Sequence, residues 1–115
     1  MRGIVLAVAA IGFGVFLSGG TTIQASSYTI SITDDRIIPN AITVAANQKT
    51  HLTIHNVGRK THNFVIPDFY IFTPNLRPQQ GTTVEFVPEK KGAFTYYSDA
   101  GGVPEPGLSG TFKVK

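Results

Sequence analysis

The sequence contains no cysteine, and its single methionine is Met1. A chain without cysteine forms no disulfide bond and has no thiolate for catalysis, for an iron–sulfur cluster or for a metal site. Only 15% of its 115 residues are charged, and basic residues stand side by side only in pairs, at Arg59-Lys60 and Lys90-Lys91. Nucleic-acid-binding domains of this size gather Lys and Arg on one face or tail, so the composition argues against a nucleic-acid partner.

The first 25 residues have the pattern of a targeting segment. A single positive charge at Arg2 precedes an unbroken run of fifteen apolar residues, 3–17, and a small residue, Ala25, ends the segment. This pattern is typical of a secretory signal peptide. The alternative is an uncleaved anchor, although a spanning helix needs about 20 apolar residues. We therefore predict that residues 1–25 are a signal peptide or membrane anchor. We predict one domain at 26–115, outside the cytoplasm, either periplasmic or secreted, or held at the membrane by its N-terminus.

After residue 25, apolar and polar residues alternate with a period of two, and no helical pattern exceeds two turns. Thr, Val, Ile, Tyr and Phe dominate these runs, as expected for half-buried strands. Pro and Gly clusters separate them at short intervals, which is typical of a two-sheet β-sandwich. The alternating segments are 28–33, 42–44, 51–55, 83–86, 94–97 and 112–114.

Four segments of the chain carry recognisable motifs: IPNAITV at 38–44, TIHNVG at 53–58, THNFVI at 61–66, and the stretch 92–114 that ends in GLSGTFKV. In these segments the chain resembles the small bacterial and archaeal cupredoxin-like domains, which are related to plastocyanin-type blue copper proteins. The resemblance covers residues 36–115. It implies an all-β, Greek-key β-sandwich of about seven to eight strands.

The resemblance also implies where a copper site would lie. In the family, the His of the H-N-F segment is the first copper ligand, and the loop between the last two strands supplies a Cys, a His and a Met. These positions fall on His62, Ser98, Val103 and Leu108. A type 1 copper site needs two imidazoles, a thiolate and a weak axial thioether. We therefore predict a degenerate site with no cofactor, in which His62 alone remains as a residual metal-ligand position.

Two further histidines lie on one predicted strand. His51 and His55 are four residues apart, on the side opposite Leu52 and Ile54. At about 3.3 Å per residue they lie roughly 13 Å apart, too far to share an ion. Each would need a carboxylate from a neighbouring strand to bind Cu(II), Zn(II) or Fe(III). We favour the interpretation that they are exposed polar residues, as we also expect Asp34 to be a solvated charge in a turn.

The sequence gives little support for catalysis. Ser98 and His62 should lie close together, but Asp99 follows Ser98 directly, and adjacent strand residues point to opposite faces. A Ser-His-Asp triad is therefore not expected, and we predict no catalytic residue and no enzyme.

We predict an extracytoplasmic, non-catalytic binding or structural module that lacks type 1 copper. Its partner would be a protein that contacts the loop 99–108 or a sheet edge, and the only membrane contact would be through the N-terminal segment. Val103 and Leu108, if exposed, would give this loop an apolar patch; otherwise the loop is a tight connection that replaces the structural role of the metal. The alternative is a periplasmic or extracellular protein that handles copper or iron, binding the ion weakly through His and carboxylates. A blue-copper electron carrier is the least favoured hypothesis.

Overall fold

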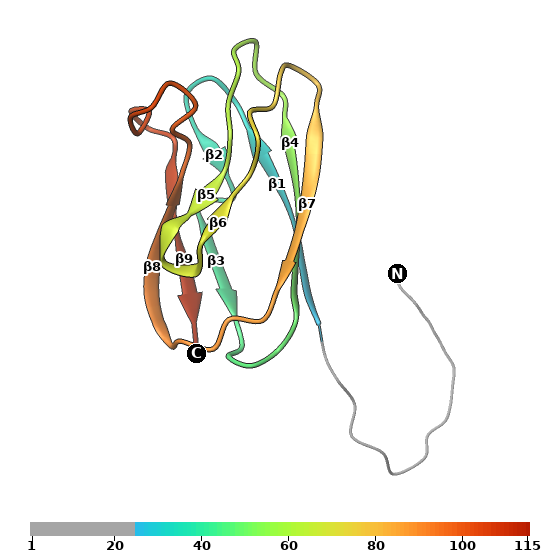
Figure 1. Ribbon diagram of the computed structural model, residues 1–115, viewed down its shortest axis with the longest axis vertical. Helices are drawn as coiled ribbons and strands as arrows, with labels where there is room; N and C mark the ends of the chain where they lie inside the picture. Colours follow the sequence, from blue (N-terminus) through green and yellow to red (C-terminus); the bar gives the residue numbers. More distant parts are fainter. Residues whose placement is uncertain (1–24) are drawn as a thin grey trace, which may run out of the picture.

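The structure is a computed structural model that describes residues 25–115. The predicted targeting segment, apart from Ala25, lies outside these residues. Within them, nine strands form two layers (Figure 1). The elements are β1 (Ser26–Ile32), β2 (Ile37–Ile38), β3 (Ala41–Val44), β4 (Thr50–Asn56), β5 (Val65–Ile66), the 3-10 turn η1 (Pro67–Phe69), β6 (Ile71–Phe72), β7 (Gly81–Phe86), β8 (Gly92–Tyr97) and β9 (Ser109–Val114). No helix among residues 25–115 combines the length and hydropathy needed to cross a membrane.

The nine strands form two sheets. One sheet has the order β2-β1-β4-β7, and the other has the order β3-β9-β8-β5-β6. β1 with β4 and β3 with β9 are parallel pairs, and the remaining neighbours are antiparallel. The chain crosses between the layers after β2, β3, β4, β6 and β7. The predicted all-β Greek-key sandwich is thus confirmed. The strand count exceeds the predicted seven to eight because β2, β5 and β6 have two residues each, too few to show an alternating pattern.

The core lies between the two sheets and follows the alternation in the sequence. In β4, Leu52 and Ile54 are fully buried, while His51 and His55 point outward, as predicted. The core side chains are Ile30, Ile32, Ile37, Ile42, Val44, Leu52, Ile54, Phe64, Ile66, Ile71, Leu76, Tyr96, Leu108, Phe112 and Val114. Burial of Tyr96, whose hydroxyl donates to the Pro39 carbonyl, raises its pKa to about 12.

The two ends of the sandwich differ in what they carry. At the upper end in Figure 1, the β1–β2 turn (33–36), the segments 57–62 and 77–80 and the loop 98–108 come together, and we call this end the loop pole. At the lower end lie residues 25–26, 45–49, 87–91 and 115, and we call it the entry pole because the described chain begins there.

Candidate functional site

His62 is held rigidly at the loop pole. Its backbone pairs with that of Leu76 through two hydrogen bonds of 3.0 Å and 2.7 Å, and its side chain is completely buried. Nδ1 lies 3.1 Å from both carboxylate oxygens of Glu105, and Nε2 lies 2.9 Å from Oδ1 of Asp34. The imidazole is therefore clamped between two carboxylates on opposite edges of the ring. Both contacts are hydrogen bonds from the ring when each nitrogen carries a proton.

Asp34 connects the β1–β2 turn to the segment that follows β4. Its carboxylate accepts the backbone N–H groups of Arg59 and Lys60, each at 3.0 Å, as well as the His62 contact. The His62 hydrogen bond, followed by the two backbone bonds, lowers the Asp34 pKa from 3.8 to about 2. The prediction that Asp34 is simply a solvated turn charge is wrong. Its side chain is 33% exposed, and its carboxylate is bonded to the buried His62 ring and to two backbone amides.

Glu105 brings the loop 98–108 onto His62. Burial raises its pKa, but hydrogen bonds from Ser98 and His62 oppose this effect, and the net result is a lowered pKa. Backbone bonds close the loop upon itself, from Glu105 N–H to Ser98 O (2.9 Å), from Leu108 N–H to Glu105 O (3.1 Å) and from Ser98 N–H to Leu108 O (3.2 Å). The loop thus presents an ionised carboxylate to the imidazole.

Ser98 is fully buried and also faces Glu105. Its Oγ accepts the Asn63 N–H at 3.1 Å and donates to Oε2 of Glu105. Two of the four positions that the resemblance assigns to copper ligands, His62 and Ser98, therefore bring their polar atoms to one carboxylate.

Asp99 is bound to Asn63, not to His62. The Asn63 amide donates to Asp99 Oδ1 at 2.9 Å, and Asn63 Oδ1 accepts the Asp99 N–H at 2.7 Å. The carboxylate that orients His62 on its Nε2 edge is Asp34. The described residues thus do not assemble the Ser98–His62–Asp99 triad considered from the sequence.

The other two copper-ligand positions differ in burial. Val103 is 67% exposed, whereas Leu108 is only 1% exposed and belongs to the core. Of the two alternatives left open for this loop, an exposed patch that includes Leu108 is not found, because the Leu108 side chain packs inward just before β9. Exposed apolar surface on the loop comes from Val103 with Pro104 and Pro106.

The donors around His62 do not fit a type 1 copper ion. Such an ion needs a second imidazole and a thiolate beside the first histidine. The Nδ1 edge of His62 instead faces a carboxylate and a hydroxyl, from Glu105 and Ser98. Asp34 lies on the opposite ring edge and does not converge with them. Across residues 25–115, no three or more His, Cys, Asp or Glu side chains form a group that could hold a metal ion.

A second histidine–glutamate pair lies on the outer face of the β2-β1-β4-β7 sheet. His51 of β4 stands opposite Glu85 of β7, with His51 Nδ1 3.1 Å from Glu85 Oε2. The bond from His51, followed by the charge of Lys49, lowers the Glu85 pKa. His55 faces Gly81 instead. The cross-strand carboxylate needed by the metal hypothesis thus exists for His51, but Gly81 stands opposite His55.

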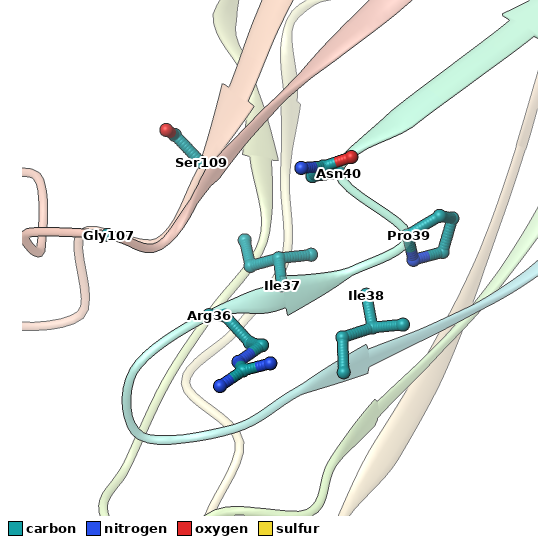
Figure 2. Close-up of a pocket in the computed structure, with 7 residues that line it drawn as sticks. All are labelled: Arg36, Ile37, Ile38, Pro39, Asn40, Gly107 and Ser109. Atoms are coloured by element: carbon teal, nitrogen blue, oxygen red, sulfur yellow. The ribbon is translucent and has the colours of Figure 1, made fainter.

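A surface pocket lies near the loop pole, but His62 and its two carboxylate partners do not line it. Figure 2 shows the pocket between the β2–β3 corner and the end of the loop, with a volume of about 340 Å³. Its one charged lining residue, Arg36, is paired with Asp35 at 3.5 Å. The remaining lining residues are Ile37, Ile38, Pro39, Asn40, Gly107 and Ser109. None of them is a nucleophile paired with a base, so the pocket does not resemble an active site.

Asp34 and Glu105 were not predicted as partners of His62. A signal for Glu105 is present, since it lies in the loop between Val103 and Leu108. A buried histidine needs a hydrogen-bond partner for each ring nitrogen, and without a metal an acidic residue of the facing loop is a natural candidate. Asp34 had no such signal, because 28 residues separate it from His62.

Comparison with known proteins identifies the family and the fold. The chain matches the cupredoxin-like domain family over residues 5–107. No curated protein sequence matches it. Among solved structures it is similar to auracyanin of Roseiflexus castenholzii, with 17% identity and a TM-score of 0.64 over 84% of this chain and 99% of that one. It is similar to auracyanin B, with 16% identity and a TM-score of 0.68 over 84% and 92%.

A third similar structure is the metal-binding domain of a Cu(I)-exporting P-type ATPase of Streptococcus pneumoniae, solved with Cu(I). The identity is 11% and the TM-score 0.66, over 83% of this chain and 99% of that domain. At these identities the structural matches show the fold alone. Together with the family match over most of the sequence, they show that this chain belongs to the cupredoxin-like domain family.

Proposed function

We propose that this protein is an extracytoplasmic, non-catalytic binding or structural module in which the Glu105 carboxylate takes the place of the copper ion. One observation carries the proposal: His62 Nδ1 and Ser98 Oγ, the first-histidine and cysteine positions of the family, both bond to Glu105. A negative carboxylate here satisfies the two polar groups that an ion would otherwise bind. The N-terminal pattern of apolar residues supports the extracytoplasmic location.

In this proposal, the hydrogen-bond network has the structural role of the metal. The network joins the loop 98–108 to His62 and Asn63, and Asp34 joins them to the β1–β2 turn. Hydrogen bonds to charged groups contribute about 1.5–3 kcal/mol each when well formed. A set of this kind is sufficient to fix a loop that in a copper protein is fixed by coordination.

A fixed loop with apolar residues at its tip is suited to contact a protein. Val103, Pro104 and Pro106 are exposed on it. The prolines and the closed backbone lower the conformational entropy that a partner contact would cost. We therefore propose that a protein partner binds at the loop pole.

The test uses two matched substitutions of exposed valines. Val103→Glu places a charge on the loop pole, and Val87→Glu places the same charge at the entry pole, where Val87 is 47% exposed. The wild-type chain is cross-linked in its native host, and the partner is identified by mass spectrometry. We expect Val103→Glu to abolish the cross-link and Val87→Glu to keep it. A monomer without a cross-linked partner, or equal loss in both variants, would contradict the proposal.

A second candidate function is the handling of copper or iron through nitrogen and oxygen ligands. The observation that favours it is Asp34 on Nε2 of His62, because metal-binding histidines generally donate their other ring N–H to a carboxylate. Glu105 and Ser98 would then supply oxygen ligands on the Nδ1 side. Calorimetric titration with Cu(II), Zn(II) and Fe(III) separates the candidates. Micromolar or tighter binding that is lost in His62→Gln but kept in His51→Gln would favour metal handling.

A further inference from the structure

The entry pole carries an excess of positive charge that the loop pole lacks. Three backbone bonds draw its segments together, from Ser26 N–H to Lys49 O (3.0 Å), from Ala46 N–H to Lys115 O (2.9 Å) and from Asn47 N–H to Pro88 O (2.7 Å). The lysines gathered there are all exposed, and one acidic residue, Glu89, accompanies them. These lysines are Lys49, Lys90, Lys91 and Lys115.

The loop pole has equal numbers of acidic and basic side chains. Its acids are Asp34, Asp35, Asp99 and Glu105, and its bases are Arg36, Arg59, Lys60 and Arg77. Between the poles, the charges sum to −1, from one basic residue, Lys113, and two acidic residues, Glu85 and Asp68. The net positive charge of residues 25–115 therefore resides at the entry pole, at the lower end of Figure 1.

The entry pole is also where the apolar N-terminal sequence joins the domain. β1 begins at Ser26, nine positions after the apolar run 3–17 ends. An extended chain of that length reaches no further than about 30 Å. If the run is retained in a bilayer, this pole is therefore the part of the domain held closest to the lipid headgroups.

Neither feature alone makes a strong membrane contact. Fifteen apolar residues are fewer than the about 20 that span a bilayer. A few lysines near an anionic surface each add a modest attraction. In lipid-anchored proteins a single acyl chain binds membranes only marginally, and a basic patch is one of the second signals that make the anchoring stable. An apolar segment next to a basic pole combines two signals in the same way.

We propose that the entry pole docks on an anionic phospholipid surface, with Lys49, Lys91 and Lys115 facing the headgroups. Lys90 is partly engaged in the fold, because its Nζ lies 5.7 Å from the Phe94 ring centroid and 6.0 Å from that of Phe69. Docking of this kind directs the loop pole away from the membrane. It extends the membrane contact predicted from the sequence, which involved the N-terminal segment alone.

The test uses the full chain, to which a single introduced cysteine gives one labelling site, since the sequence has none. Ala93→Cys labels an exposed position beside the entry pole, paired in register with Lys113. Gly101→Cys labels the loop pole, where an added Cβ meets no atom within 4 Å. Each protein is mixed with vesicles of phosphatidylcholine, with or without phosphatidylglycerol. Access of an aqueous quencher to a fluorophore on the cysteine is then measured.

We expect several-fold protection at position 93 on the anionic vesicles only, loss of that protection in about 1 M salt, and no protection at position 101. The triple variant Lys49→Gln, Lys91→Gln, Lys115→Gln should bind the anionic vesicles roughly a hundredfold more weakly than the wild type, at about fivefold per lysine. The matched control has Arg59→Gln, Lys60→Gln and Arg77→Gln at the loop pole and should retain most of the protection. Equal protection on neutral vesicles, protection at position 101, equal loss in both triple variants, or no protection anywhere would overturn the proposal.

Discussion

Two histidine–glutamate pairs in this protein have the same chemistry and differ in their surroundings. Nδ1 of His62 lies 3.1 Å from Glu105, and Nδ1 of His51 lies 3.1 Å from Glu85. The His62 side chain is completely buried and that of Glu105 is 24% exposed, whereas His51 and Glu85 are 37% and 53% exposed. The first pair also has further partners, Asp34 and Ser98, while the second lies on an open sheet face.

The difference shows that distance alone does not make a site. In water, a solvent-exposed pair loses most of its Coulomb attraction to screening and gains little stability. In the buried pair, each polar atom that lost a partner would remain without water, which is costly. We therefore expect the Glu105 pair to determine the order of the loop 98–108, and the Glu85 pair to have almost no effect.

The largest effect should follow the loss of Glu105. Glu105→Ala leaves His62 Nδ1 and Ser98 Oγ without their shared acceptor. Removing one partner of a buried pair costs about 3–5 kcal/mol, and we expect about 2 kcal/mol here because Glu105 is partly exposed. Urea unfolding measures the change, and hydrogen exchange should show faster exchange of the loop amides. An unfolding free energy equal to that of the wild type would show that the carboxylate does not hold the loop.

The second-largest effect should come from acid, which should weaken the contacts of Asp34 and Glu105 with His62. The pKa values of Asp34 and Glu105 are lowered in the folded chain, to about 2 for Asp34. Carboxylates of this kind stabilise the fold above their unfolded pKa, near 4, and the contribution is lost as the pH falls towards the folded value. The free energy of unfolding should therefore decrease between about pH 4.5 and pH 2. The decrease should be shallower in Glu105→Gln, and an unchanged slope in that variant would contradict the assignment.

Asp34→Asn should have a smaller effect than Glu105→Ala. The amide keeps an oxygen that can accept from His62 Nε2 or from the Arg59 and Lys60 amides, but it loses the negative charge. We expect a measurable decrease in thermal stability with the fold retained, detected as a lower Tm. Asp35→Asn, next in the chain but without contact to His62, is the matched control and should leave the Tm nearly unchanged.

The exposed pair should give the smallest effect. We expect Glu85→Gln and His51→Gln to leave the urea midpoint within experimental error, since salt and water already screen the interaction. A midpoint shift as large as that of Glu105→Ala would show that burial does not distinguish the two pairs.

The sequence predicted the long strands well, because alternation in segments such as 51–55 records which side chains face the core. It did not predict β2, β5 and β6, whose two residues carry no period. At the site, it identified His62 and Ser98 as neighbours. It could not identify Asp34, because the tertiary fold alone brings the β1–β2 turn to the His62 ring. It left open whether Leu108 is exposed, because a proline-rich loop carries no alternation that shows which of its side chains face the core.

The most direct test of the proposed carboxylate substitution is an NMR measurement of the His62 ring nitrogens, before and after one equivalent of Zn(II) is added. We predict that Nδ1 carries a proton bonded to Glu105 and that its signal does not move on addition of the ion. A change of the Nδ1 signal to that of a metal-bound imidazole, absent in His62→Gln, would contradict the proposal and restore a metal-binding role to this centre.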